Sequence, residues 1–187
     1  GTSYLFYIND GSESQVFQHP PPPILGHRFT KSSCSSLSDN GTDVFTNAFG
    51  GYILIQNACG VASANVVPLY VSSKPVPAIN ASPPSTCTNN NVTFINTSSF
   101  GNTITPTGGA TSLCEQKGKN VWTISPSTGF ILASGSLGSL NGNAANQAVW
   151  TDAADTLDIQ FVNAGVYTIK IYVGNVRCGM DSTVTTI

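Results

Sequence analysis

Apolar and polar side chains alternate along short stretches of this chain, and turn-forming Gly, Pro, Asn and Ser residues separate the stretches. Within residues 91–98, for example, Val92 and Phe94 alternate with Thr93 and Ile95. A period of two predicts strands, because successive side chains of a strand point to opposite faces. The clearest predicted strands are residues 3–9, 50–58, 64–72, 91–98, 120–125, 156–162 and 165–173.

Helical patterns are almost absent, and one helical turn is the most we expect within residues 144–154. Many short strands separated by turn residues are typical of a β-sandwich or barrel. We therefore predict an all-β protein. Trp122 lies in a predicted strand at a position that fills a sandwich core, and we assign it to packing.

A short pattern occurs twice, about 115 residues apart, and indicates two domains of the same kind. Gly51-Tyr52-Ile53-Leu54-Ile55 precedes Asn57-Ala58-Cys59-Gly60, and Gly165-Val166-Tyr167-Thr168-Ile169 precedes Asn175-Val176-Arg177-Cys178-Gly179. Each copy predicts a penultimate strand, a hairpin and a final strand. We expect domains at 1–74 and 75–187, joined by a connector that two prolines stiffen, Pro75 and Pro77.

The first predicted domain is the shorter of the two. Residues 78–83 and 92–98 supply two opening strands before the Trp122 strand, whereas nothing comparable precedes residues 3–9. We expect the first sandwich to lack its two opening strands, which leaves a sheet edge and part of its core open.

Charge is scarce: Lys and Arg number 7, Asp and Glu number 9, and charged residues make up 9% of the chain. Ser, Thr and Asn fill 59 of the 187 positions instead. Nucleic-acid binding is excluded, since it needs clustered cationic side chains. No apolar run is long enough to span a bilayer, so no membrane insertion by this segment is expected.

Five cysteines, Cys34, Cys59, Cys87, Cys114 and Cys178, lack the paired spacing of a zinc site. They indicate disulfides in an oxidising compartment. From the predicted strand order we expect Cys114 to pair with Cys178 and Cys34 with Cys59, which leaves Cys87 over.

No motif of an enzyme or a cofactor site occurs, and we expect no catalytic residues and no cofactor. Asp152, Asp155 and Asp158 are candidates for calcium, and capping of turns is the favoured alternative. Asp10 is expected to bond turn backbone, and so is His27. Trp150 follows several amides and is a candidate sugar ligand, against the favoured alternative that it covers one end of a sandwich.

Several short motifs resemble the PKD domain family. In the first domain these are Ile8–Ser12, His27-Arg28-Phe29 and the Gly51–Gly60 run; in the second, Val121–Ile124 and Gly165–Gly179. Together they look like the tandem PKD/Ig-like repeats of large Bacteroidota surface adhesins, the SprB-like gliding-motility proteins. The resemblance implies seven-stranded sandwiches, type IX secretion and a place on the outer cell surface.

What the resemblance implies for function is a structural and adhesive repeat module in surface attachment or gliding motility. Its expected partners are neighbouring repeats, surface polysaccharide, or the secretion and motility machinery. Thr156 and Ser182 fit a Bacteroidota O-glycosylation motif, each after an aspartate. Two alternatives stay open: an accessory carbohydrate-binding or spacer module of a secreted hydrolase, and a filament subunit that is completed by strand donation.

Overall fold

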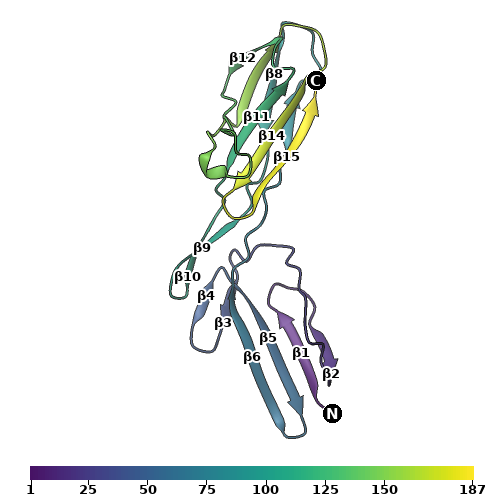
Figure 1. Ribbon diagram of the computed structural model, residues 1–187, viewed down its shortest axis with the longest axis vertical. Helices are drawn as coiled ribbons and strands as arrows, with labels where there is room; N and C mark the ends of the chain where they lie inside the picture. The colour runs from purple at the N-terminus through teal and green to yellow at the C-terminus, as the bar shows by residue number, and fades with distance from the viewer. The chain divides into compact units, whose positions relative to one another are not determined.

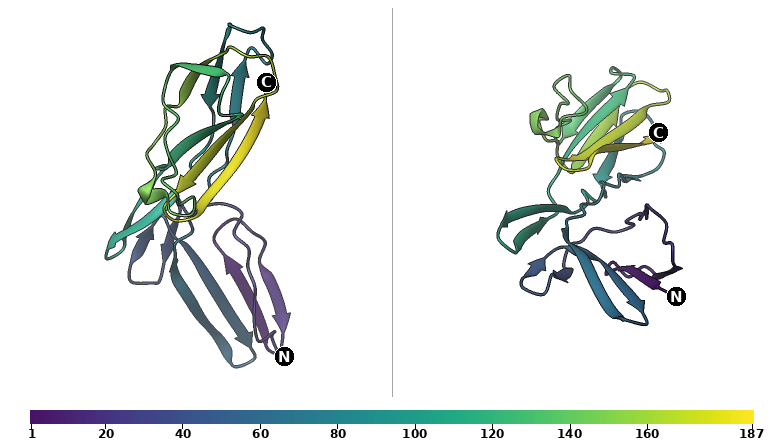
Figure 2. Two further views of the ribbon diagram at one scale, coloured as in Figure 1. Left: turned by 45° about the horizontal axis from the view of Figure 1, so that its top comes forward. Right: turned by 60° about the horizontal axis from the view of Figure 1, so that its bottom comes forward.

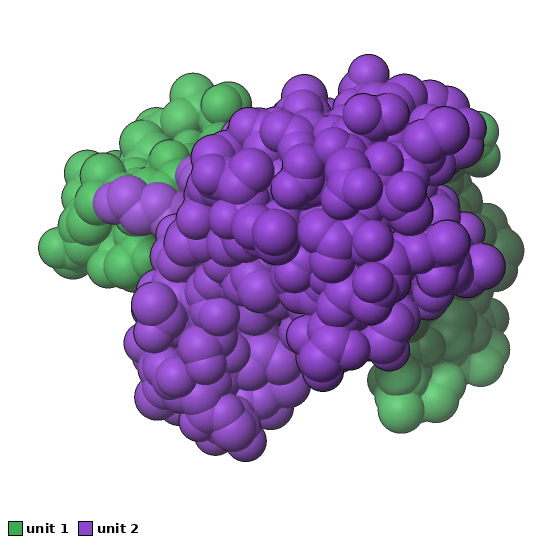
Figure 3. Space-filling view, turned by 90° about the horizontal axis from the view of Figure 1, so that it is seen from above, with its two compact units in different colours: residues 1–73, 103–115 green, residues 74–102, 116–187 purple.

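A computed structural model describes residues 1–187 and contains fifteen β-strands and one three-residue 3₁₀ helix, η1 (Gln147–Val149) (Figure 1). None of its helices has the length and apolar composition needed to cross a membrane. The predicted all-β class is confirmed. The chain forms two compact units, which Figure 3 colours separately: unit 1 comprises residues 1–73 and 103–115, and unit 2 comprises residues 74–102 and 116–187.

Unit 2 is a sandwich of two antiparallel sheets. One sheet has the order β12 (Phe130–Ser134), β13 (Thr156–Phe161), β8 (Asn91–Asn96) and β7 (Ile79–Ser82). The other has the order β11 (Lys119–Ser125), β14 (Thr168–Asn175) and β15 (Gly179–Thr186). In chain order these strands correspond to A, B and C, then D, E, F and G, with A, B, E and D in one sheet and C, F and G in the other. That is the constant-type immunoglobulin arrangement, so unit 2 is Ig-like.

The core of unit 2 lies between the two sheets. Trp122 on β11 is 1% exposed, as predicted, and its Nε1 donates a hydrogen bond to the carbonyl oxygen of Ala154 at 2.9 Å. Alternate residues of the facing strands complete the core: Val92, Phe94, Leu157, Ile159, Phe161, Ile169, Ile171 and Val173. A continuous two-sided core of this kind supplies most of a sandwich's stability.

Tyr167 stabilises one end of this sandwich through its hydroxyl group. Its ring is buried just before β14, and its hydroxyl donates to the carbonyl oxygens of Gly129 at 2.9 Å and Asn163 at 3.1 Å. This is the tyrosine corner of Ig-like sandwiches, formed from the tyrosine of the repeated sequence pattern.

Removing this hydroxyl tests its role. We expect Tyr167→Phe to lower the free energy of unfolding of unit 2 by about 1–2 kcal/mol, because the hydrogen bonds that join the buried ring to the Gly129 and Asn163 carbonyls are lost. Urea denaturation followed by Trp fluorescence measures it. Tyr172→Phe on β14 is the control, because the Tyr172 ring packs under the Lys170 ammonium rather than anchoring a loop. An equal effect of both substitutions contradicts the assignment.

Unit 1 is built around one four-stranded antiparallel sheet. Its order is β2 (Gln15–Gln18), β1 (Ser3–Ile8), β5 (Phe49–Asn57) and β6 (Gly60–Leu69), and Figure 2 shows β5 and β6 as a long hairpin. The other sheets of unit 1 have two strands each: β3 (Leu37–Asp39) with β4 (Val44–Thr46), and β9 (Thr103–Gly108) with β10 (Thr111–Glu115). No sheet of similar size faces the four-stranded one within unit 1.

The β9–β10 hairpin, which the sequence patterns did not predict, completes unit 1. In sequence it lies between β8 and β11 of unit 2, yet it packs against the end of β4. The Thr46 amide donates to the carbonyl oxygen of Ala110 at 3.0 Å, and the Ser112 hydroxyl donates to the carbonyl oxygen of Thr46 at 2.6 Å. Asn47 Nδ2 adds a bond to the Ser112 carbonyl at 2.8 Å. The predicted division at residues 74/75 therefore lies one residue from the observed join but omits this hairpin.

The position of the hairpin explains why the predicted Cys114–Cys178 disulfide is wrong. Cys114 on β10 bonds Cys34, with 5.6 Å between their Cα atoms. The prediction that Cys114 pairs with Cys178 assumed that Cys114 lies in a long connection of the second domain, at the same end as Cys178. Cys178 instead remains a free thiol of unit 2. Its pKa is raised above the ordinary value, because the effect of partial burial exceeds the opposing effect of the Lys74 charge.

The predicted Cys34–Cys59 bond fails for a different reason. The Ser33 hydroxyl donates to the carbonyl oxygen of Asn47 at 2.6 Å, which places Cys34 near the start of β5. Cys59 follows the far end of this strand of 9 residues. Nine residues of strand span about 30 Å, far beyond the reach of a disulfide. Cys59 and Cys87 are both exposed free thiols.

Candidate functional site

The most distinctive surface feature is an apolar groove on one face of the unit 1 sheet. It has a volume of about 380 Å³. Side chains of β1, β5, β6 and the segment 25–29 line it, chiefly Phe6, Ile8, Leu25, Phe29, Ile53 and Val66. A sheet face with this composition is normally buried against a second layer.

Strand pairing places these side chains on the same face. Phe6 lies opposite Ile53, and Ile53 lies opposite Ala64, so the three form a row across β1, β5 and β6. The neighbouring row runs through Ile8 and Val66. Yet the side of the groove along β6 is open, because Val66 is 64% exposed.

The segment 25–29 covers the other side of the groove. The ring of Phe29 stacks on buried Phe49 with 5.6 Å between the ring centroids. The His27 and Phe29 rings form a T-shaped pair with 4.7 Å between their centroids. These contacts hold an irregular segment on the sheet where a strand would otherwise lie. The groove therefore has one built wall and one open side.

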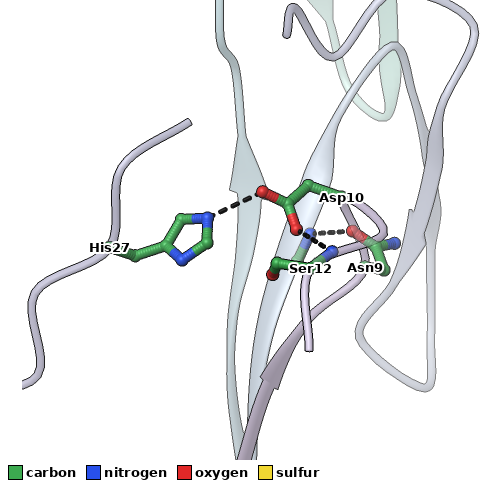
Figure 4. A network of polar contacts seen from close by, with 5 residues as sticks. Asn9, Asp10, Ser12 and His27 are labelled. Atoms are coloured by element: carbon green, nitrogen blue, oxygen red, sulfur yellow. Dashed lines mark hydrogen bonds and ion pairs between the residues drawn. The ribbon is translucent and has the colours of Figure 1, made fainter. Parts of the chain in front are cut away.

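A buried polar network anchors this wall at the end of β1 (Figure 4). His27 Nε2 donates to Asp10 Oδ2 at 2.7 Å, and the Ser12 amide donates to Asp10 Oδ1 at 2.9 Å. Beside it, the Gly50 amide donates to Asn9 Oδ1 at 2.8 Å. The prediction that Asp10 bonds turn backbone is confirmed. The prediction that His27 does so is wrong, because the Asp10 carboxylate comes within its reach.

The network stabilises the charged form of Asp10. Burial by itself raises the pKa of this carboxyl, since its side chain is only 6% exposed. Hydrogen bonds from Ser12 and the hydrogen bond and charge of His27 outweigh burial and lower the pKa from 3.8 to about 2. The pair positions the wall of the groove.

The three calcium candidates do not form a site. Asp152 Oδ1 accepts the Asn120 amide at 2.8 Å, and Asp155 Oδ1 accepts the Asn120 side chain at 3.1 Å. Asp158 accepts the hydroxyls of Thr93 and Ser134, both at 2.7 Å, and these bonds lower its pKa. Each carboxylate is occupied by protein donors, and no three His, Cys, Asp or Glu side chains gather as metal ligands.

Trp150 is not available to a sugar. It is 3% exposed, and its Nε1 donates to the carbonyl oxygen of Asn143 at 2.9 Å. The sugar-facing prediction is wrong because η1 and the loop before it fold the ring inward, next to Gly174. The favoured alternative, a Trp that covers part of the sandwich, agrees with this burial.

The two glycosylation candidates lie on strands of unit 2. Thr156 begins β13 and is exposed, whereas Ser182 lies within β15 and is half-buried. Both hydroxyls follow an aspartate, as the sequence motif requires. The groove of unit 1, in contrast, was not predicted as a site. Its only sequence signal was the expected absence of two opening strands.

Comparisons with known proteins add little to this geometry. No protein-family model matches the chain, and no curated protein matches it. A crystal structure of the N-terminal four Ig domains of Dscam1 isoform 1.9 is similar over 98% of this chain, at 13% sequence identity and a TM-score of 0.33. The chain spans 36% of that chain. A likeness this low carries no argument, and the Ig-like assignment depends on the strand order of unit 2.

The polar network predicts how acid affects unit 1. Because folding lowers the pKa of Asp10, the stabilisation is fully present above pH 3.8 and is lost as the pH falls toward 2. We expect Asp10→Asn to lower the free energy of unfolding at pH 7 by about 1–3 kcal/mol. It should also flatten the pH dependence of unit 1 unfolding between these two values.

Thermal unfolding at a series of pH values, followed by circular dichroism, measures both effects. Asp43→Asn is the matched control, since Asp43 is exposed between β3 and β4. If Asp10→Asn and Asp43→Asn shift the acid limb equally, Asp10 does not anchor the wall.

Proposed function

We propose that this chain is a structural and adhesive repeat module of a secreted cell-surface adhesin, which transmits force between neighbouring modules. The Cys34–Cys114 disulfide carries the proposal. It joins positions 80 apart and ties the β9–β10 hairpin to unit 1. A disulfide also indicates an oxidising compartment, which supports an extracellular location.

The disulfide changes the path that tension follows through the chain. When the two ends are pulled, force passes from residue 34 directly to residue 114. The residues between them, which include β3 to β9, are not stretched. At about 3.5 Å per extended residue, the bond withholds about 280 Å of chain length. A module that stays short under tension suits a surface protein that connects a cell to its substrate.

The surface chemistry agrees with this role. Only 9% of residues are charged, so contacts made by the module change little with ionic strength. The proposed partners are neighbouring repeats of the same polypeptide and either surface polysaccharide or the secretion and motility machinery. The PKD-like motifs support a place among the repeats of gliding-motility adhesins, with O-glycans on Thr156 and Ser182.

Single-molecule pulling tests the mechanical part of the proposal. We expect the oxidised chain to extend about 280 Å less than the Cys34→Ser/Cys114→Ser variant when both are fully unfolded from their ends. Reducing agent should lengthen the oxidised chain to the same value and leave the variant unchanged. Equal extensions before and after reduction would contradict a bond that shields residues 35–113 from force.

A further inference from the structure

We propose that the groove face of unit 1 binds an extended strand pair with apolar side chains at alternate positions, which completes a second sandwich. The occupant is of the kind that β7 and β8 form in unit 2. This inference concerns the packing of unit 1 and does not depend on the adhesive role. Completion of unit 1 in this way would be a case of strand donation.

The β5–β6 hairpin of unit 1 is equivalent to the β14–β15 hairpin of unit 2. Asn57 Oδ1 accepts the Cys59 amide at 2.8 Å, and Asn175 Oδ1 accepts the Cys178 amide at 2.7 Å. An asparagine side chain therefore caps the turn after both penultimate strands, although the turn after Asn175 is one residue longer. Counting back from the asparagine, the positions of Ile53 and Ile55 in β5 match Ile171 and Val173 in β14.

Equivalent positions in these two hairpins are differently buried. Ile171 and Val173 are 0% exposed, because the sheet that contains β8 and β13 faces them. In unit 1 the corresponding face is covered only in part, by the segment 25–29. Across the groove Ala64 is exposed, and Val66 is 64% exposed. Unit 1 presents a core face without the layer that buries it in unit 2.

The lining of the groove indicates the chemistry of the occupant. No Asp, Glu, Lys or Arg lines the groove, and the Nε2 of His27, which does line it, bonds Asp10. The rest of the lining is almost wholly aliphatic and aromatic. Such a surface favours aliphatic and phenyl side chains and penalises charged ones. In unit 2, Val92 and Phe94 of β8 meet this requirement, and both are 0% exposed. A paired strand also satisfies its own backbone, which a lone strand would not.

A tethered strand pair tests the proposal in the full chain. A second copy of residues 77–98, with its Cys87 position changed to Ser, is joined ahead of Gly1 through a flexible Gly/Ser linker. The tether gives an effective concentration of about millimolar, so weak docking is detectable. We expect fluorescence of the dye ANS to fall, and the Tm of unit 1 to rise by about 5 °C.

Two controls make the result specific to the groove. In the first, Val92→Asp and Phe94→Asp in the added copy alone should abolish both effects. In the second, Ala64→Asp places a charge in the groove and should abolish them, whereas Ser63→Asp places the same charge on the opposite face of β6 and should not. Ala64 and Ser63 are both exposed, so neither substitution removes a buried side chain.

Three outcomes would overturn the proposal. The tethered pair could leave ANS fluorescence and Tm unchanged. The Ala64→Asp and Ser63→Asp variants could respond alike, which would place docking elsewhere. Finally, sedimentation of the untethered chain could show a dimer that Ala64→Asp dissociates, in which case a second copy covers the face.

Discussion

Burial of one apolar face of each sheet is the constraint on which the rest of this structure depends. In unit 2 the constraint is met by a second sheet: Trp122 and the alternate residues of β14 pack against β8 and β13. Because the core is two-sided, the outer faces are free to carry Ser, Thr and Asn. The low charge of the chain is compatible with stability since packing, not ion pairing, holds the sandwich together.

Unit 1 meets the same constraint with other means. Phe29 covers part of the sheet, the Asp10–His27 pair fixes the segment that carries it, and the β9–β10 hairpin adds strands beside β4. The Cys34–Cys114 disulfide then closes the unit covalently. In the chain-entropy view, a bond across 80 positions limits the unfolded ensemble and stabilises by about 4–5 kcal/mol. The bond therefore adds stability to a unit whose main sheet lacks a second sheet of similar size against it.

Local patterns in the sequence predicted what local chemistry determines. The period of two placed most long strands within a few residues of their observed bounds, and Trp122 was correctly assigned to the core. The N-D-G-S turn correctly indicated a backbone bond for Asp10. Long-range pairing could not be derived in this way. Nothing in the Thr- and Gly-rich residues 103–115 shows that they leave one unit to pack on another, and the disulfide predictions failed at that point.

Repeats are also less reliable for side-chain direction than for strand order. The repeated pattern matches Tyr52 with Tyr167, yet only Tyr167 forms a tyrosine corner. The Tyr52 ring stacks on Tyr7 instead, and its hydroxyl donates to the Asp39 carbonyl at 3.1 Å. The spacing of the two copies accounts for this difference: Tyr52 precedes Asn57 by five positions, whereas Tyr167 precedes Asn175 by eight. Because strand side chains alternate between faces, an odd difference in spacing puts the two tyrosines on opposite faces relative to the asparagine.

The central claim is that unit 1 depends on its disulfide whereas unit 2 depends on its two-sided core. Native-state hydrogen exchange before and after reduction measures this directly, because Cys34–Cys114 is the sole disulfide and the other cysteines are already thiols. We predict that reduction removes amide protection from β1, β5 and β6 and leaves β11 and β14 protected. Unchanged protection in unit 1, or equal loss in both units, would contradict the account.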